Sequence, residues 1–166
     1  KNIKFNYKPI FLGGLHNLAG IDAPAFNKYK MKNMKNDCDL VAKKNNIDFN
    51  WNSNFPINSL SIMRGYLTVD EVKKEEYLNS FFEAYWRDNQ DLSNAKILLS
   101  LLNNLKIESD IFLKSIKEKK VKEKLKKLTN EAFNKEVFGA PTFIVNNKIF
   151  WGQDRFDYAI EELRNT

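Results

Sequence analysis

The chain has 166 residues, enough for one domain with a substantial core, and 43% of them are hydrophobic. Its 27 Lys and Arg against 21 Asp and Glu give a net charge of +6, which mildly favours anionic ligands and does not by itself indicate nucleic acid. No apolar run approaches the ~18 residues of a membrane span, and no leader with a charged start and an apolar centre opens the chain. We therefore expect a soluble protein with no membrane partner, cytoplasmic unless a leader was removed.

The first residues alternate between apolar and polar side chains. Ile3 to Tyr7 shows this alternation and Pro9 ends it, which predicts a short strand. From Leu15 to about Leu128 the pattern is helical, with no repeat and no low-complexity linker. Each apolar face in this region is compatible with ordinary core packing.

A basic run follows. Residues 114–127 hold eight lysines and two glutamates, without the interleaved aromatic side chains that stack on nucleic acid bases. Val121, Leu125 and Leu128 form an apolar stripe, so a solvated helix face is favoured over a nucleic-acid surface. We expect the helix to continue to Val137 and to end at Gly139.

One cysteine and one histidine limit the chemistry available to this chain. Cys38 stands alone, so the chain has neither a disulfide framework nor the Cys-x-x-Cys motif of a dithiol oxidoreductase. Its helical surroundings favour a small buried apolar role. His16 has no Cys partner at ligand spacing, and we expect no metal site. A Ser-His-Asp triad built on His16 stays open, although a lone histidine is usually structural.

The most informative stretch lies near the C-terminus. Thr142 to Val145 is β-branched or aromatic, two asparagines follow, and Ile149 to Trp151 is a second apolar run, which predicts a hairpin. Pro141 cannot donate to a ladder, so it suits the first position of a strand, and an X-Pro bond is readily cis. With a cis bond, the backbone of Ala140 would face outward and unpaired. The alternative is that Gly139 to Pro141 merely ends a helix and starts a strand.

Asp154 follows the second predicted strand. Apolar residues recur with helical period from Phe156 to Leu163, which predicts Asp154 as the N-cap of a last helix. The first N–H groups of such a helix suit a carboxylate, and Asp154 itself would attract an ammonium group.

Three short sequence segments together resemble a known family. Residues 139–143, 150–155 and 9–14 are similar to the 2-hydroxychromene-2-carboxylate isomerases and their relatives, the kappa-class glutathione transferases, which belong with DsbA-like proteins. The resemblance covers nearly the whole chain and implies an α/β, thioredoxin-like fold with a large inserted all-helical domain. Residues 1–14 and 129–166 would form the thioredoxin-like domain, and residues 15–128 the insertion.

The resemblance also implies a glutathione site. Ala140, before the cis-proline Pro141, would offer its N–H and C=O to the extended thiol peptide. Asp154, with Arg155 in the same segment 150–155, would contact the γ-glutamyl end of glutathione. Lys30 would pair with the glycyl carboxylate. The choice of Lys30 depends on the register, because lysines also stand at positions 28 and 32.

Two departures from the family stand out. Ile21 occupies a position where the family often has an asparagine that contacts glutathione. The family's first strand and helix carry Ser-Pro-Tyr-Ser or a similar word, whose serine hydrogen-bonds the glutathione sulfur and favours the thiolate. No match to it occurs here. We therefore expect the first strand-helix unit to be missing from the chain and the catalytic residue to lie before Lys1.

The implied activity is that of a glutathione-dependent isomerase or transferase, most like 2-hydroxychromene-2-carboxylate isomerase. The thiolate would add to a conjugated double bond of a small electrophilic or aromatic substrate, permit rotation and be expelled. One alternative is a DsbA-like thiol-disulfide oxidoreductase, which needs Cys-x-x-Cys in the missing helix. Another is a non-catalytic binding relative, in which Phe81, Phe82, Tyr85 and Trp86 could serve a homodimer.

Overall fold

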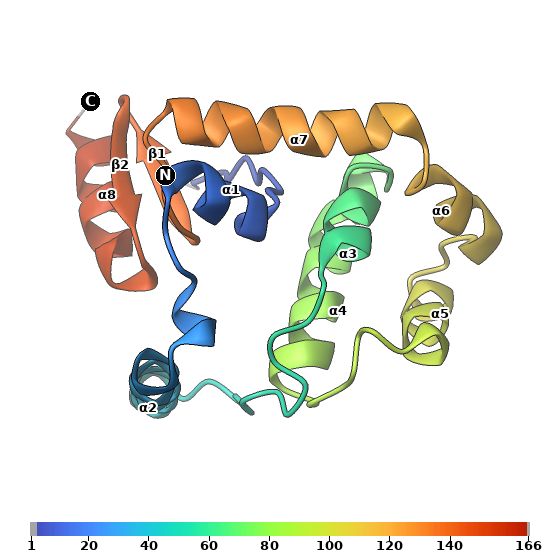
Figure 1. The fold of residues 1–166 in the computed structure, drawn as a ribbon, viewed down its shortest axis with the longest axis horizontal. Helices are drawn as coiled ribbons and strands as arrows, with labels where there is room; N and C mark the ends of the chain where they lie inside the picture. Colours follow the sequence, from blue (N-terminus) through green and yellow to red (C-terminus); the bar gives the residue numbers. More distant parts are fainter. Residues whose placement is uncertain (1–2, 166) are drawn as a thin grey trace. The chain divides into compact units, whose positions relative to one another are not determined.

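The computed structural model describes residues 3–165, which form helices and one small sheet (Figure 1). The chain divides into two compact units, and the second of the two boundaries between them, after Glu123, falls inside helix α7. The first unit contains Lys1–Asp22 and Lys124–Thr166, and the second contains Ala23–Glu123. In chain order the elements are α1 (Leu12–Ala19), α2 (Lys28–Asn45), α3 (Leu60–Tyr66), α4 (Lys74–Trp86), α5 (Ala95–Asn104), α6 (Ser109–Ser115), α7 (Lys119–Asn134), β1 (Thr142–Val145), β2 (Lys148–Trp151) and α8 (Phe156–Arg164).

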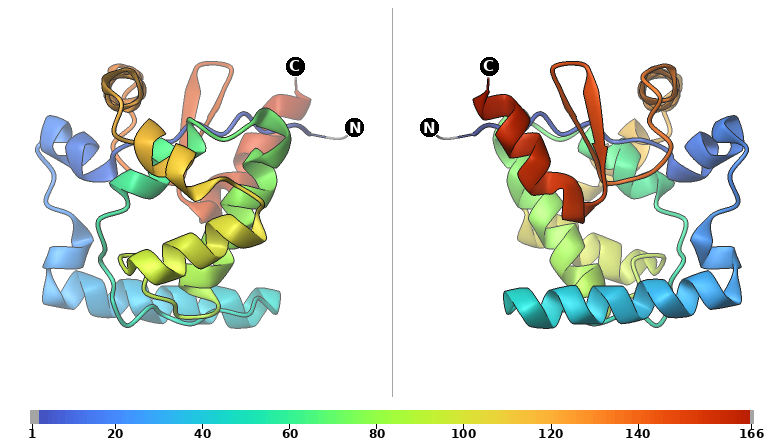
Figure 2. Two further views of the ribbon diagram at one scale, coloured as in Figure 1. Left: turned by 90° about the vertical axis from the view of Figure 1, so that its right-hand side faces the viewer. Right: turned by 90° about the vertical axis from the view of Figure 1, so that its left-hand side faces the viewer.

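The predicted hairpin is confirmed. β1 and β2 pair antiparallel, with Val145 opposite Lys148 across a two-residue turn. Asn146 and Asn147 both have positive φ, 51° and 62°, as a type I′ turn requires, and asparagine tolerates this conformation better than most residues. Helix α8 packs beside the hairpin (Figure 2), where Glu162 accepts hydrogen bonds from Lys148 at 2.8 Å and from Asn146 at 3.1 Å.

The predicted strand at Ile3 to Tyr7 is wrong. Residues 3–11 have no regular structure, and the sheet of the described chain consists of β1 and β2 alone. A strand exists only as part of a hydrogen-bonded ladder, and this segment pairs with neither strand. It is held in other ways. The ring of Phe5 lies 5.9 Å from that of Phe156, and the N–H of Phe11 donates to the hydroxyl of Thr129 at 2.9 Å.

Helix α7 also ends earlier than predicted. It stops at Asn134, and Glu136 takes up a left-handed conformation with φ of 63°. The N–H of Val137 then turns back to the carbonyl of Ala132, which satisfies a group at the helix end. This left-handed cap closes the helix before Val137 and Gly139.

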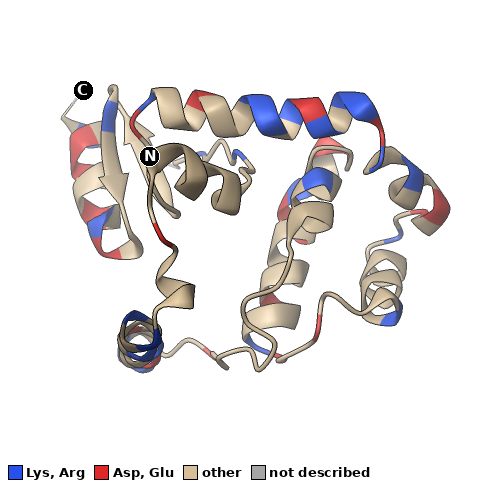
Figure 3. Ribbon diagram, in the orientation of Figure 1, with Lys and Arg blue, Asp and Glu red and all other residues tan. Residues whose placement is uncertain are grey.

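The basic run forms the solvated helix face that its pattern predicted. Val121 and Leu125 are buried, and the lysines of α7 are exposed. Figure 3 shows the Lys and Arg positions recurring along α7. Three of these lysines form exposed ion pairs with glutamates 118, 123 and 131, which contribute little to stability.

The core of the second unit surrounds Tyr77 of α4, whose side chain is 1% exposed and whose hydroxyl donates to the carbonyl of Ile62 at 2.9 Å. Gly65 lets α3 approach closely, since a Cβ there would collide with the Tyr77 hydroxyl and the ring of Phe112. The buried members of this core are Ile62, Tyr66, Val69, Tyr77, Phe81, Ala84, Tyr85, Leu92, Leu102, Leu105, Phe112 and Ile116.

A loop between α2 and α3 packs against the end of α4. The rings of Phe49 and Phe55 lie 5.7 and 5.5 Å from the ring of Trp86, and Trp51 joins the same cluster. Asn52 anchors the loop from inside, because its buried side chain bonds to three backbone groups.

No helix in residues 3–165 is long and apolar enough to cross a membrane. The two compact units follow from packing and do not test whether residues 15–128 are an inserted domain. That division stays a prediction.

Candidate functional site

The loop between α7 and β1 contains the predicted glutathione contacts Ala140 and Pro141. Their peptide bond is cis, and both residues are exposed. Gly139 is buried against the indole of Trp151, where any larger residue would collide with the ring. The N–H of Gly152 donates to the carbonyl of Pro141 at 2.9 Å, which extends the hairpin ladder by one pair.

The hairpin register determines which backbone groups of this segment point away from β2. Pro141, Phe143 and Val145 face β2, because Val145 is paired across the turn and backbone groups alternate in direction along a strand. The N–H and C=O groups of Ala140, Thr142 and Ile144 therefore point to the opposite side, which we call the free edge. Within residues 3–165 they have no hydrogen-bond partner.

Asp154 and Arg155 lie just after β2 in the same unit. The prediction of Asp154 as a helix N-cap is wrong, because residues Gln153–Arg155 form a 3-10 turn and α8 begins only at Phe156. Gly152 precedes this turn with φ of 99°, a conformation that favours glycine. The Asp154 carboxylate makes no capping hydrogen bond. It lies exposed, 3.3 Å from the guanidinium of Arg155.

Lys30 lies in the second unit, in the first turn of α2. Asn27 caps this helix, since its side-chain oxygen accepts from the backbone N–H groups of Tyr29 and Lys30 at 3.1 Å each. The Lys30 ammonium is exposed and forms no ion pair with a described residue. Four of the predicted contacts therefore lie in the first unit, namely Ala140, Pro141, Asp154 and Arg155, whereas Lys30 lies in the second. The roles of all five residues stay predictions.

Cys38 is a half-buried residue of α2. Burial, followed by the nearby carboxylates of Asp39 and Asp37, raises the pKa of its thiol. The thiolate is therefore disfavoured, whereas a nucleophilic cysteine needs a lowered pKa. Among the described residues, no group of three or more His, Cys, Asp or Glu side chains is placed to hold a metal ion.

Comparison with known proteins identifies the family. A family model described as a DSBA-like thioredoxin domain matches residues 1–164. The chain belongs to the DSBA-like thioredoxin domain family. This membership confirms the predicted thioredoxin-like fold, here helix-rich with a small sheet.

Two relatives of this DSBA-like chain carry the same name. The curated 2-hydroxychromene-2-carboxylate isomerase of Sphingobium xenophagum is 22% identical over 154 residues, which are 92% of this chain and 78% of that protein. A solved structure of 2-hydroxychromene-2-carboxylate isomerase, prepared with selenomethionine, superposes with a TM-score of 0.86 at 21% identity and covers 96% of this chain and 79% of that one. The predicted resemblance to this isomerase family is confirmed.

Proposed function

We propose that this DSBA-like protein is an isomerase of a small conjugated aromatic substrate and uses glutathione as its thiol cofactor. The likeness to a curated 2-hydroxychromene-2-carboxylate isomerase along 92% of the chain carries the proposal. The chain's own cysteine offers a poor alternative thiol, because the pKa of Cys38 is raised.

The exposed backbone of Ala140 fits the cysteinyl part of glutathione. Its N–H and C=O point to the free edge and have no partner among residues 3–165, so an extended peptide can pair with them as a short added strand. No side chain covers this position, since Ala140 and Pro141 are both exposed.

Asp154 and Arg155 fit the charged γ-glutamyl end of the ligand. Their mutual ion pair is exposed and 3.3 Å long, and such pairs contribute little, so a ligand can replace it at small cost. The Asp154 carboxylate would then accept from the ligand's ammonium, and Arg155 would donate to its carboxylate. The pairing of Lys30 with the glycyl carboxylate stays a prediction from the sequence, because Lys30 belongs to the second unit.

Bound glutathione would supply the thiol that adds to the conjugated double bond of the substrate, permits rotation and leaves. The first unit's own contribution would be to position that thiol at Ala140 and to hold the γ-glutamyl end of the tripeptide. The residue that stabilises the thiolate was predicted to lie before Lys1, and this also stays a prediction.

Calorimetric titration with reduced glutathione tests the cofactor. We expect binding to the unmodified protein, weaker binding to Asp154→Ala and unchanged binding to Asp157→Ala, a matched exposed carboxylate in the first turn of α8. Absence of heat at millimolar glutathione would contradict the cofactor assignment. The isomerase assignment is checked by following the absorbance of 2-hydroxychromene-2-carboxylate with and without glutathione; no conversion in either case would overturn it.

A further inference from the structure

Two aromatic side chains, which we call the aromatic platform, lie beside the Ala140 position. The ring of Trp151 in β2 lies 5.0 Å from the ring of Phe138, and the two planes are tilted by 53°. Trp151 also packs against Gly139, where a Cβ would collide with the indole nitrogen. Gly139 directly precedes Ala140, and consecutive Cα atoms are only about 3.8 Å apart. The indole therefore lies next to the backbone that is proposed to hold the cysteinyl part of glutathione.

Contacts within residues 138–152 hold the aromatic platform in place. The hydroxyl of Thr142 donates to the carbonyl of Gly139 at 2.8 Å, and the N–H of Gly152 donates to the carbonyl of Pro141 at 2.9 Å. The first bond fixes the loop under the indole, and the second fixes the end of β2 that carries it. The positions of both rings therefore depend on this one segment of the chain.

Each ring of the platform still has a surface that a ligand can reach. Trp151 is 51% exposed and Phe138 is 37% exposed, although each packs against the other. A further ring can stack on this surface or meet it edge to face, and such pairs contribute more than the burial of their area alone. Residues 138–145 contain no charged side chain, so an apolar ligand group placed there desolvates no charge of this segment.

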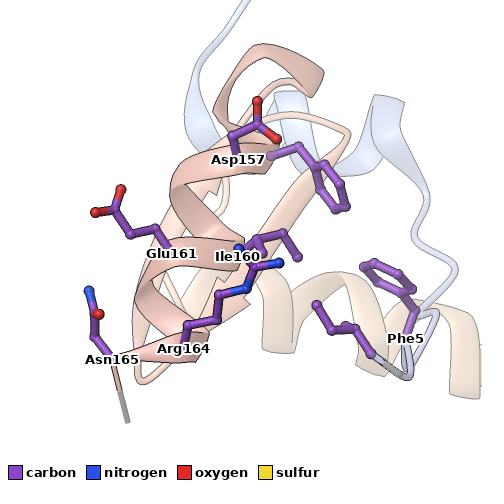
Figure 4. Close-up of a pocket in the computed structure, with 8 residues that line it drawn as sticks. Phe5, Asp157, Ile160, Glu161, Arg164 and Asn165 are labelled. Carbon is purple, nitrogen blue, oxygen red and sulfur yellow. The ribbon is translucent and has the colours of Figure 1, made fainter. Parts of the chain in front are cut away.

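A groove beside α8 is a separate surface of the same unit (Figure 4). It has a volume of about 700 Å³ and is lined in part by Phe156 and Ile160. The ring of Phe156 lies 5.2 Å from the ring of Phe143 in β1. Phe143 follows Thr142, which pairs with Trp151, and side chains alternate between the two faces of a strand. The groove and the platform therefore lie on opposite faces of the hairpin, and substitutions can distinguish them.

We propose that the aromatic platform holds the aromatic ring of the substrate beside the glutathione sulfur. This placement rests on the proposed function, since it requires the cysteinyl part of glutathione at Ala140. A ring joined to that sulfur needs an apolar surface within a few bond lengths, and the platform lies against the neighbouring Gly139. Stacking on Trp151 would favour a flat conjugated ring over a saturated group of the same size. The platform would thus select aromatic substrates.

Titration calorimetry with two stable glutathione derivatives tests this placement. S-methylglutathione reports on the peptide site alone, whereas S-benzylglutathione carries a ring on the same sulfur. We expect the benzyl derivative to bind the unmodified protein about three- to tenfold more tightly, which is the range of one aromatic pair. Trp151→Leu should remove this preference while S-methylglutathione still binds. Trp151→Phe keeps a smaller ring and should retain part of the preference.

Three further variants sharpen the test. Gly139→Ala leaves both rings in the sequence but adds a Cβ that displaces the indole, so the preference for the benzyl group should fall. Phe82→Leu is the matched control, because Phe82 is an aromatic residue of the second unit that is 55% exposed. Ile160→Ala alters the groove instead of the platform. Both Phe82→Leu and Ile160→Ala should keep the preference of the unmodified protein.

The possible failures are distinguishable. Equal affinities of the two derivatives for the unmodified protein would refute the platform and leave the glutathione assignment standing. A preference that persists in Trp151→Leu, or that disappears in Ile160→Ala, would also refute it, because the ring would then lie elsewhere. Equally tight binding of S-cyclohexylmethylglutathione would refute the selection of an aromatic ring. If neither S-methyl- nor S-benzylglutathione binds, the cofactor assignment is overturned, and the platform with it.

Discussion

Asn52 is a buried polar residue of the second unit, and replacing its side chain should lower the free energy of unfolding substantially. Its side chain is 1% exposed. The amide nitrogen donates to the carbonyls of Tyr85 at 2.8 Å and Gln90 at 2.9 Å, and the amide oxygen accepts from the N–H of Asn54 at 2.8 Å. Asn52→Ala removes all three bonds and leaves backbone groups at the end of α4 without partners.

The expected loss follows from these bonds. A typical intramolecular hydrogen bond contributes ~0.5–1.5 kcal/mol net, and buried groups left unpaired add to the cost. For Asn52→Ala we expect the free energy of unfolding to fall by about 2–4 kcal/mol. Asn52→Asp should be worse near neutral pH and recover in mild acid, because a carboxylate would face two carbonyl oxygens, whereas the protonated acid can donate to one of them.

Urea unfolding followed by tryptophan fluorescence measures this loss, since Trp51 and Trp86 lie in the aromatic cluster that Asn52 anchors. Asn54→Ala is the matched control. Its side chain is exposed and makes no hydrogen bond, so its stability should stay within about 0.5 kcal/mol of the unmodified protein. Equal stabilities of Asn52→Ala and Asn54→Ala would refute the reasoning.

Further predictions concern the same core and use urea unfolding. Tyr77→Phe should cost about 1–2 kcal/mol, because the Ile62 carbonyl loses a buried donor, whereas Tyr85→Phe should cost nothing, since the Tyr85 hydroxyl is buried without an acceptor. Burial, followed by Asp91, raises the pKa of Tyr85 to about 12, so stability present below about pH 10 is lost as pH rises towards 12, and Tyr85→Phe should lose less over that range. Gly65→Ala should cost about 1–2 kcal/mol net, because overpacking outweighs the gain in helix propensity; a stabilised variant would contradict the close packing of α3.

The hairpin could be predicted from sequence because its determinants are local. Two asparagines tolerate the positive φ of the turn, and the runs on either side have high strand propensity. The strand at Ile3 to Tyr7 could not be judged in this way. Alternation describes one chain segment, whereas a strand also needs a partner, and the partner is absent from the described sheet.

The candidate site was partly predictable for a similar reason. Ala140 and Pro141 lie in the segment 139–143, which resembles the family. The exposed backbone there follows from the position of proline directly before β1. The N-cap prediction for Asp154 failed because a 3-10 turn separates β2 from α8, and helical periodicity alone does not mark where the first α-helical turn begins. The groove of about 700 Å³ beside α8 (Figure 4) could not be predicted from the sequence, because Phe5 and Arg164, which both line it, are far apart in the chain.

The division of the chain has a topological consequence for handling the protein. Among the described residues, 3–22 and 124–165 belong to the first unit, and the second unit is one continuous segment between them. A single proteolytic cut between Ala23 and Glu123 leaves two fragments, each carrying part of the first unit, so they stay together under native conditions only through non-covalent contacts. Native electrophoresis of a nicked sample should then show one band, whereas denaturing electrophoresis should show two fragments.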